Sequence, residues 1–129
     1  MAKKIVSVAG DYGIPPEDIV IDPLAMPVGA EPRAVTLFVE TVRLIREELG
    51  VNMTCGASNT SFGLPGRHTL GAAFLAIAAS HGLTSAIMDA RNVETVEAVR
   101  AADFLLGHDE WGARWIANHR AKQAAAAAS

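Results

Sequence analysis

The chain has 129 residues, which allows one domain with a modest core and leaves no room for a second. Half of the residues are hydrophobic, only 5% are aromatic and the formal net charge is −3, so the charge balance gives no reason to expect a nucleic-acid partner. Cys55 has no second cysteine to pair with, and no apolar run approaches the ~20 residues of a membrane span, so we expect a soluble, cytoplasmic protein.

The first predicted elements are a helix and a short strand. Apolar residues recur at a helical spacing over residues 2–12, and Gly13 ends the pattern. The apolar, β-branched run at residues 19–21 predicts a strand buried on both faces, as is typical of parallel sheets. The Asp22-Pro23 pair ends this strand, because proline cannot extend the hydrogen-bond ladder.

Helices and strands continue to alternate along the chain. We expect helices at residues 34–49, 69–80, 93–106 and 110–121, strands at 51–55 and 84–88, and a frayed, low-complexity alanine tail at 124–129. One helix followed by three strand–helix units predicts a parallel sheet with right-handed crossovers. Three such strands leave two unpaired edges, so the chain is expected to be part of a larger fold or to assemble with other chains.

Polar residues follow two of the predicted strands. The stretch VNMTCGASNTSFGLPGR, residues 51–67, passes from an apolar strand through Gly56 into the cluster Ser58-Asn59-Thr60-Ser61. The upstream stretch IVIDPLAMP supplies a second polar tip at Asp22. Because parallel α/β proteins bind their ligands at the carboxyl ends of strands, the two tips predict a ligand site.

Three stretches carry a resemblance to a known family: VIDPLAMPVGA, VNMTCGASNTSFGLPGRHTLGAAFLAIAASHGLTSAIMDA and AADFLLGHDEWGARWI. Together they resemble the carboxyl-terminal part of the methyltetrahydrofolate:corrinoid-protein methyltransferases, which are pterin-binding relatives of dihydropteroate synthase. The resemblance spans roughly residues 2–120. It implies an α/β fold, a partial (β/α)₈ TIM barrel of about the last three βα units, in residues 1–123, with the alanine tail outside it. The first five strands of such a barrel are absent.

The resemblance implies roles for two residues at the strand tips. Asp22 occupies the position where the family places an aspartate that accepts hydrogen bonds from the pterin ring. Asn59 matches the asparagine near N5 of the folate, the atom that carries the methyl group, and is the catalytic residue that we expect. The residues alone leave two alternatives open, an aspartate that caps the following turn and a turn-forming asparagine with a side-chain-to-backbone bond.

Further binding residues are expected around this pair. Gly56 allows close backbone approach to the ligand or serves as a turn device, and Ser58 and Ser61 line the site or cap the loop. Arg67 is expected to reach the glutamate tail of the folate or a carboxylate of the corrinoid protein, the alternative being a solvated side chain. Asp89, at the end of the third strand, completes the substrate-binding set. No histidine, cysteine or carboxylate spacing indicates a metal site.

The implied function is part of a methyltransferase that moves a methyl group, in either direction, between N5 of (methyl)tetrahydrofolate and the cobalt of a corrinoid (cobalamin) protein. Folate is then the substrate, the corrinoid is carried by a partner protein, and this chain binds no metal. A complementary chain or further copies of this one would supply the missing strands. The alternatives are a dihydropteroate-synthase-type enzyme, whose usual late basic pair is lacking here, and a non-catalytic truncated or interaction module.

Overall fold

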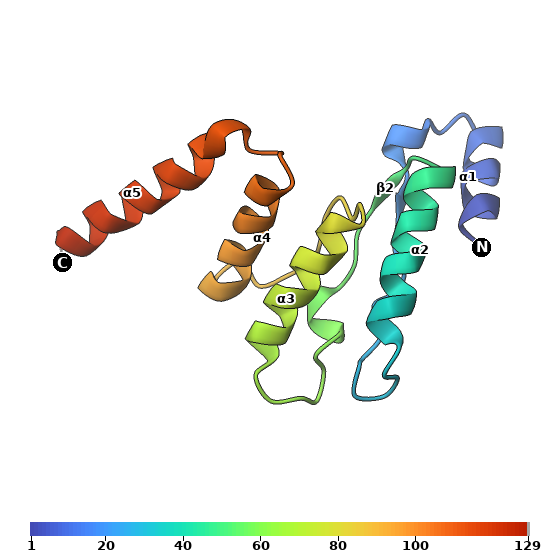
Figure 1. Cartoon of the computed structure of the whole chain (residues 1–129). Helices are drawn as coiled ribbons and strands as arrows, with labels where there is room; N and C mark the ends of the chain where they lie inside the picture. Colours follow the sequence, from blue (N-terminus) through green and yellow to red (C-terminus); the bar gives the residue numbers. More distant parts are fainter. Residues whose placement is uncertain (129) are drawn as a thin grey trace.

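The computed structural model describes residues 1–128, which form five helices and two short parallel strands (Figure 1). The 3-10 turns lie at Pro16–Asp18, Ala57–Asn59 and Glu110–Gly112. The helices and strands are α1 (Ala2–Asp11), β1 (Val20–Ile21), α2 (Ala34–Glu48), β2 (Asn52–Met53), α3 (Arg67–Ser80), α4 (Val93–Leu105) and α5 (Ala113–Ala127).

Strands β1 and β2 pair in parallel, with Val20 opposite Asn52 and Ile21 opposite Met53. The third predicted strand is reduced to an isolated parallel bridge between Gly56 and Ile87. Next to it, the Thr84 hydroxyl accepts from the Met53 N–H and donates to the Met53 C=O, both at 2.8 Å. A side chain thus takes the place of a backbone partner for the Met53 N–H. The Ser85 N–H donates to the Met53 carbonyl at 3.0 Å and the Ile87 N–H to the Cys55 carbonyl at 2.8 Å, so only part of a parallel ladder forms.

One face of the strands is buried and the other is open. Ile21, Met53 and Cys55 pack into the core against α2 and α3, where the Phe38 and Phe74 rings lie 5.2 Å apart. Val20, by contrast, is 55% exposed and Ile87 is 69% exposed. The predicted burial of residues 19–21 on both faces is therefore wrong for Val20, because the helices cover only one side of the strands.

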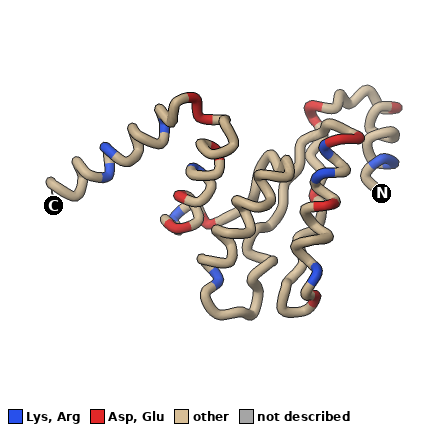
Figure 2. The backbone as a smooth tube through the Cα atoms, in the orientation of Figure 1, with Lys and Arg blue, Asp and Glu red and all other residues tan. Residues whose placement is uncertain are grey.

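Helix α5 projects from the end of α4, away from the strands (Figure 1). It has no buried residue, and the alanine run expected to fray is helical as far as Ala127. The last helix begins at Ala113 and not at Glu110, because Trp111 (φ 57°) and Gly112 (φ 65°) are left-handed and interrupt it. Figure 2 shows that charge is concentrated on α1, α2, α4 and α5, whereas α3 carries a single arginine at its start. No helix within residues 1–128 is long and apolar enough to cross a membrane.

Candidate functional site

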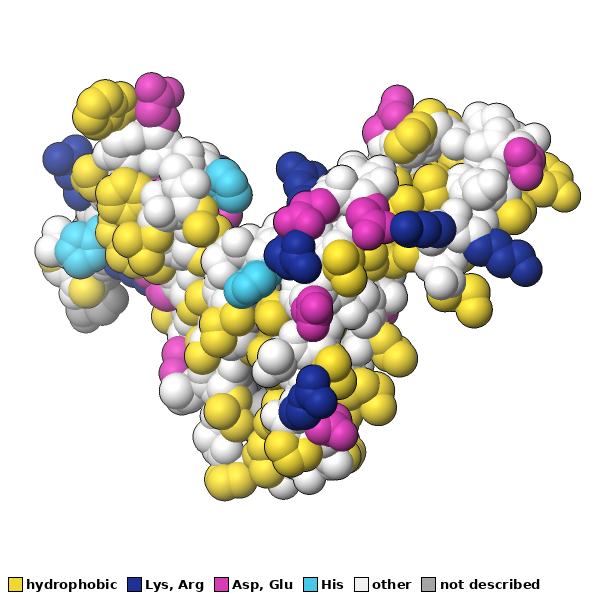
Figure 3. Space-filling model, turned by 45° about the vertical axis from the view of Figure 1, so that its right-hand side comes forward, with side chains coloured by type: hydrophobic (Ala, Val, Ile, Leu, Met, Phe, Trp, Pro, Cys, Tyr) yellow, Lys and Arg dark blue, Asp and Glu magenta, His cyan; other side chains and the backbone are white. Residues whose placement is uncertain are grey.

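The loops that follow β1 and β2 meet and form one rim at the carboxyl ends of the strands. The Val28 N–H donates to the Thr60 carbonyl at 3.0 Å. Gly29 faces Leu64 so closely that a Cβ at Gly29 would lie 3.4 Å from Leu64 Cδ2. The loops that follow the two polar tips are therefore held against each other. Hydrophobic side chains gather over these loops at the lower end of the molecule (Figure 3).

Asn59 presents a free carboxamide from a tightly bonded turn. Its N–H donates to the Gly56 carbonyl, and its own carbonyl accepts from the Phe62 N–H, both at 3.1 Å. Among the described residues the exposed Asn59 carboxamide has no hydrogen-bond partner. The side-chain-to-backbone bond of a turn-forming asparagine is thus not formed, and both groups of the amide are available to a ligand.

Gly56 is shaped by its neighbour Asn59. A Cβ at Gly56 would lie 3.1 Å from Asn59 Nδ2 and 3.4 Å from its Cγ, so the amide stands directly over the glycine. The Gly56 backbone has φ −76°, which any residue can adopt. A side chain at this position would therefore displace the Asn59 amide without straining the backbone.

Asp22 combines a turn role with a free oxygen. Its Oδ1 accepts from the Leu24 N–H at 2.8 Å. This bond caps the following turn, which is the alternative role that the sequence left open for Asp22. Leu24 is left-handed at φ 65°, an uncommon conformation for a branched side chain, and this bond helps to hold it there. Within residues 1–128, Oδ2 of Asp22 has no hydrogen-bond partner, so half of the carboxylate remains available.

Cys55 lies beneath the site as a buried thiol. Burial and the nearby negative charge of Asp22 raise the pKa of Cys55 from 9.0 to about 11. A thiol with so high a pKa is protonated at neutral pH and is a poor nucleophile, so Cys55 acts as a small core residue.

Asp89 is occupied by an ion pair. Arg91 Nε donates to its Oδ1 at 2.9 Å and Arg91 Nη2 to its Oδ2 at 3.0 Å, and the Arg91 backbone N–H adds a third bond at 3.0 Å. The Arg91 hydrogen bonds lower the pKa of Asp89 from 3.8 to about 2. Both carboxylate oxygens are therefore used before any substrate arrives.

The expected site residues divide between two clefts. Ser58, Ser61, Arg67 and Asp89 line a cleft of about 360 Å³, which His68 and Thr95 also border. Asp22 lines a separate cleft of about 440 Å³ between α1, α2 and the end of β1. Gly56 and Asn59 belong to neither lining. Within residues 1–128, no group of three or more histidine, cysteine or carboxylate side chains is placed to hold a metal ion.

Two further residues contribute to the site and are not predicted from the sequence. Leu24 is held left-handed by Asp22, and no local pattern marks a leucine for that conformation. Phe62 lies under the Arg67 guanidinium, whose carbon is 5.7 Å from the ring centre. In the sequence, Phe62 is marked only by its place in the stretch that carries the family resemblance, five residues before Arg67.

Comparisons with known proteins identify the family of this chain. Residues 1–89 match the family described as "Pterin binding enzyme". Over 110 residues the chain is 34% identical to the "Methylcorrinoid:tetrahydrofolate methyltransferase" of Eubacterium limosum, an alignment that covers 84% of this chain and 41% of that relative. The chain thus spans less than half the length of the curated relative it matches. It belongs to the pterin-binding enzyme family.

Proposed function

We propose that this chain is part of a methyltransferase that moves a methyl group between N5 of (methyl)tetrahydrofolate and the cobalt of a corrinoid protein. The observation that carries the proposal is the unbonded carboxamide of Asn59, held over Gly56 at the rim where the two strand-tip loops meet. The name of the Eubacterium limosum relative supports the choice of folate and corrinoid as the reacting pair.

In this proposal Asp22 binds the pterin ring. Its free Oδ2 accepts a hydrogen bond from the ring N–H or the 2-amino group, while Oδ1 stays with the Leu24 N–H. Each oxygen of Asp89 already accepts from Arg91, so a substrate that contacts Asp89 would share the carboxylate with this arginine. Ser58 and Ser61 border the cleft beside it, where the rest of the folate is accommodated.

Asn59 acts at the methyl-bearing nitrogen. The methyl group of a tertiary amine leaves poorly, and a hydrogen bond to N5 in the transition state makes the amine a better leaving group. A carboxamide both donates and accepts, so it follows the change in protonation at N5 without carrying charge. Since the Asn59 carboxamide has no partner within residues 1–128, forming this bond breaks no hydrogen bond inside the protein.

The proposed enzyme is completed by further strands. The residues of a parallel strand bond alternately to the two sides, so the outer edge of β1 is open to another strand. Val20 and Ile87 are exposed on the uncovered face of the strands. We propose that a complementary chain, or further copies of this one, supplies parallel strands that close a barrel over this face and bring the remaining pterin contacts.

Two other readings remain less well supported. A dihydropteroate-synthase-type reaction needs basic groups late in the barrel to hold phosphate, and Arg91, the arginine after the third strand, is bound to Asp89. A non-catalytic module would transfer no methyl group, so the experiment below also tests that alternative.

The decisive experiment is a titration of the assembled protein with methyltetrahydrofolate, with and without a corrinoid protein, alongside its mass in solution. Asn59→Ala is expected to slow methyl transfer by about a hundredfold with little change in folate Kd, because its bond forms in the transition state. Asp22→Ala is expected to raise the folate Kd by about tenfold or more, because it loses a charged hydrogen bond.

Matched controls are available on remote helices. Gln123→Ala on α5 and Asp11→Ala at the end of α1 remove the same chemical groups far from the rim. Neither is expected to change transfer or affinity. Absence of folate binding by every assembled form would overturn the proposal, and equal losses of transfer and affinity in the Asn59 and Asp22 variants would refute their separate roles.

A further inference from the structure

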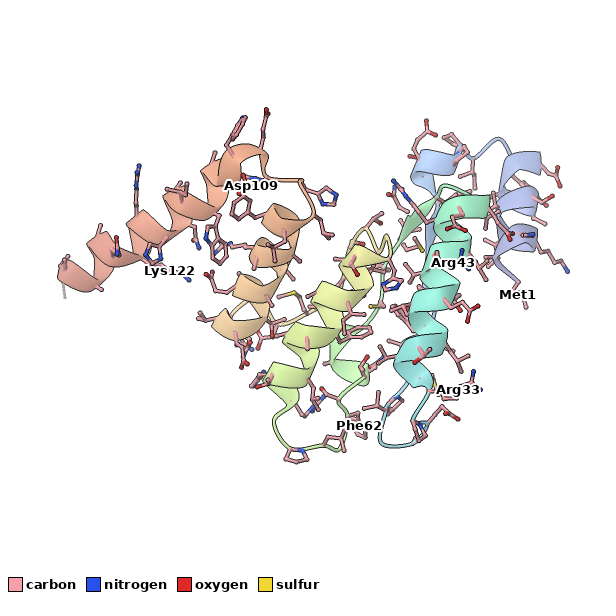
Figure 4. The ribbon with its side chains drawn as sticks, in the orientation of Figure 1. Met1, Arg33, Arg43, Phe62, Asp109 and Lys122 are labelled. Carbon is pink, nitrogen blue, oxygen red and sulfur yellow. The ribbon has the colours of Figure 1, made fainter. Side chains whose placement is uncertain are left out.

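Arg67, the first residue of α3, folds back onto the turn that carries Asn59. Its Nη2 donates to the Ser58 carbonyl at 3.0 Å, and its guanidinium lies over the Phe62 ring at 5.7 Å from the centroid. Phe62 itself lies at the lower end of the molecule among the strand-tip loops (Figure 4). The guanidinium is therefore bound to the protein by one edge and one face.

The peptide group between Ser58 and Asn59 is fixed at both ends. Arg67 holds its carbonyl, and its N–H donates to the Gly56 carbonyl at 3.1 Å. Because a peptide group is planar, fixing its C=O and N–H fixes the orientation of the whole plane. That orientation sets the direction in which the Asn59 side chain leaves the backbone.

The Asn59 carboxamide depends on this arrangement because nothing else holds it. It makes no hydrogen bond within the described part of the chain, and it lies over Gly56, which has no side chain to hold it. A side chain without bonds of its own is placed by its backbone, so the bond from Arg67 to Ser58 determines how well the amide is aimed.

We propose that Arg67 is a positioning residue, which aims the Asn59 carboxamide at the reacting nitrogen by holding the Ser58 carbonyl, with Phe62 keeping the guanidinium in place. The inference rests on the proposed function. It replaces the expected contact of Arg67 with the folate tail or with a corrinoid-protein carboxylate. Arginine suits this task because its planar group donates in its plane and stacks on an aromatic ring with its face, whereas lysine does neither.

The test separates positioning from direct binding by measuring the turn itself. Hydrogen exchange at the Asn59 amide, and the resonance of its side-chain amide, are followed by NMR in the full chain and in Arg67→Ala, Arg67→Lys and Phe62→Leu. Loss of the planar guanidinium is expected to speed exchange at the Asn59 amide about tenfold in both Arg67 variants. Phe62→Leu should have a smaller effect of the same sign, and Arg120→Ala on α5 serves as the control with no change.

Kinetics in the assembled enzyme complete the test. Arg67→Ala and Arg67→Lys are expected to lower kcat for methyl transfer while the Kd for methyltetrahydrofolate stays within about twofold. Unchanged exchange at Asn59 together with a raised folate Kd would overturn the inference and make Arg67 a ligand of the substrate. If the wild-type assembly transfers no methyl group, the proposed function fails. The exchange data alone then decide whether Arg67 holds the turn.

Discussion

At the scale of single residues, Asn59 and Asp22 differ in how much of each side chain the fold uses. Asp22 gives one oxygen to the Leu24 N–H and keeps one free, so it is both a turn cap and a candidate ligand. Asn59 gives its backbone groups to the turn and keeps its whole carboxamide free. The two alternatives weighed from the sequence therefore have different outcomes, since the capping bond forms at Asp22 and the turn bond of the side chain does not form at Asn59.

Substitution of Gly56 by alanine tests whether the placement of Asn59 matters for transfer. The new Cβ would lie 3.1 Å from Asn59 Nδ2, so the amide must shift by a few tenths of an ångström. We expect methyl transfer to fall by about tenfold, because small displacements at a reacting centre are costly. Since φ at Gly56 is −76°, the free energy of unfolding should change by less than about 1 kcal/mol.

Gly10 in α1 supplies the control for this substitution. A Cβ at Gly10 meets nothing within 4 Å, and Gly10→Ala should stabilise the helix by about 0.5–1 kcal/mol without affecting transfer. Thermal unfolding and single-turnover transfer assays measure the two effects. Wild-type transfer rates in Gly56→Ala would show that the position of the Asn59 amide is not limiting.

At the scale of elements, α5 is anchored by polar bonds and not by burial. Asp109 accepts from the Arg114 N–H at 3.0 Å through Oδ1 and from the Trp115 N–H at 2.8 Å through Oδ2, which caps the helix start. Further along, Glu97 of α4 binds Lys122 at 2.8 Å. Figure 4 places Asp109 at the corner between α4 and α5, and Lys122 on α5.

The Asp109 cap makes the attachment of α5 dependent on pH. Burial of the carboxyl acts to raise its pKa, but the N–H groups of Arg114 and Trp115 and the Arg114 guanidinium outweigh it and lower the pKa of Asp109. A pKa lower in the folded than in the unfolded state stabilises the fold above the unfolded value of about 3.9, and this stabilisation is lost as the pH falls through the folded pKa. We therefore expect α5 to loosen below about pH 4.

Asp109→Ala should reproduce that loosening at neutral pH. Trypsin is expected to cut faster after Arg114 and Arg120, with the rest of the chain protected and with the pH dependence of α5 helicity reduced. Asp11→Ala, which removes an exposed carboxylate at the end of α1, is the control and should leave the cleavage pattern unchanged. Equal cleavage rates in wild type and Asp109→Ala at neutral pH would contradict the capping role.

At the scale of the whole molecule, the uncovered face of the strands is the main feature without a partner. Helices cover one side, while Val20 and Ile87 stand exposed on the strands themselves. In the proposed enzyme this face is the interior of a closed barrel, so charge placed on it should block closure and leave the present fold intact.

Val20→Lys and Ile87→Lys test this arrangement. Both side chains are exposed, so the free energy of unfolding should change by no more than about 0.5 kcal/mol. Assembly with copies or with a complementary chain, followed by analytical ultracentrifugation, should be lost, because burying an unpaired charge is costly. Leu105→Lys, on the exposed side of α4, should assemble as wild type does. Assembly of the Val20 variant at wild-type affinity would rule out this face as the interface.

Much of the fold could be predicted because it depends on local spacing. The helix expected at residues 2–12 is observed as Ala2–Asp11, and the one at 34–49 as Ala34–Glu48, since apolar periodicity and a following glycine act within one segment. The family also follows from a contiguous motif, and the match of residues 1–89 to the pterin-binding enzymes confirms it. The roles of the site residues stay predictions, because no local pattern reports what a side chain binds.

The order of the helices, the family and the two polar strand tips can thus be read from the sequence alone, because each depends on a short run of residues. The folded structure adds which face of the strands is covered, with Val20 left exposed, and that the third strand is only a bridge beside the Thr84–Met53 contact. It also decided that Asp89 is paired with Arg91 and that Arg67 holds Ser58. These outcomes depend on where side chains lie in the folded chain and on contacts such as that of Thr84 with Met53, and periodicity along the sequence carries no information about either.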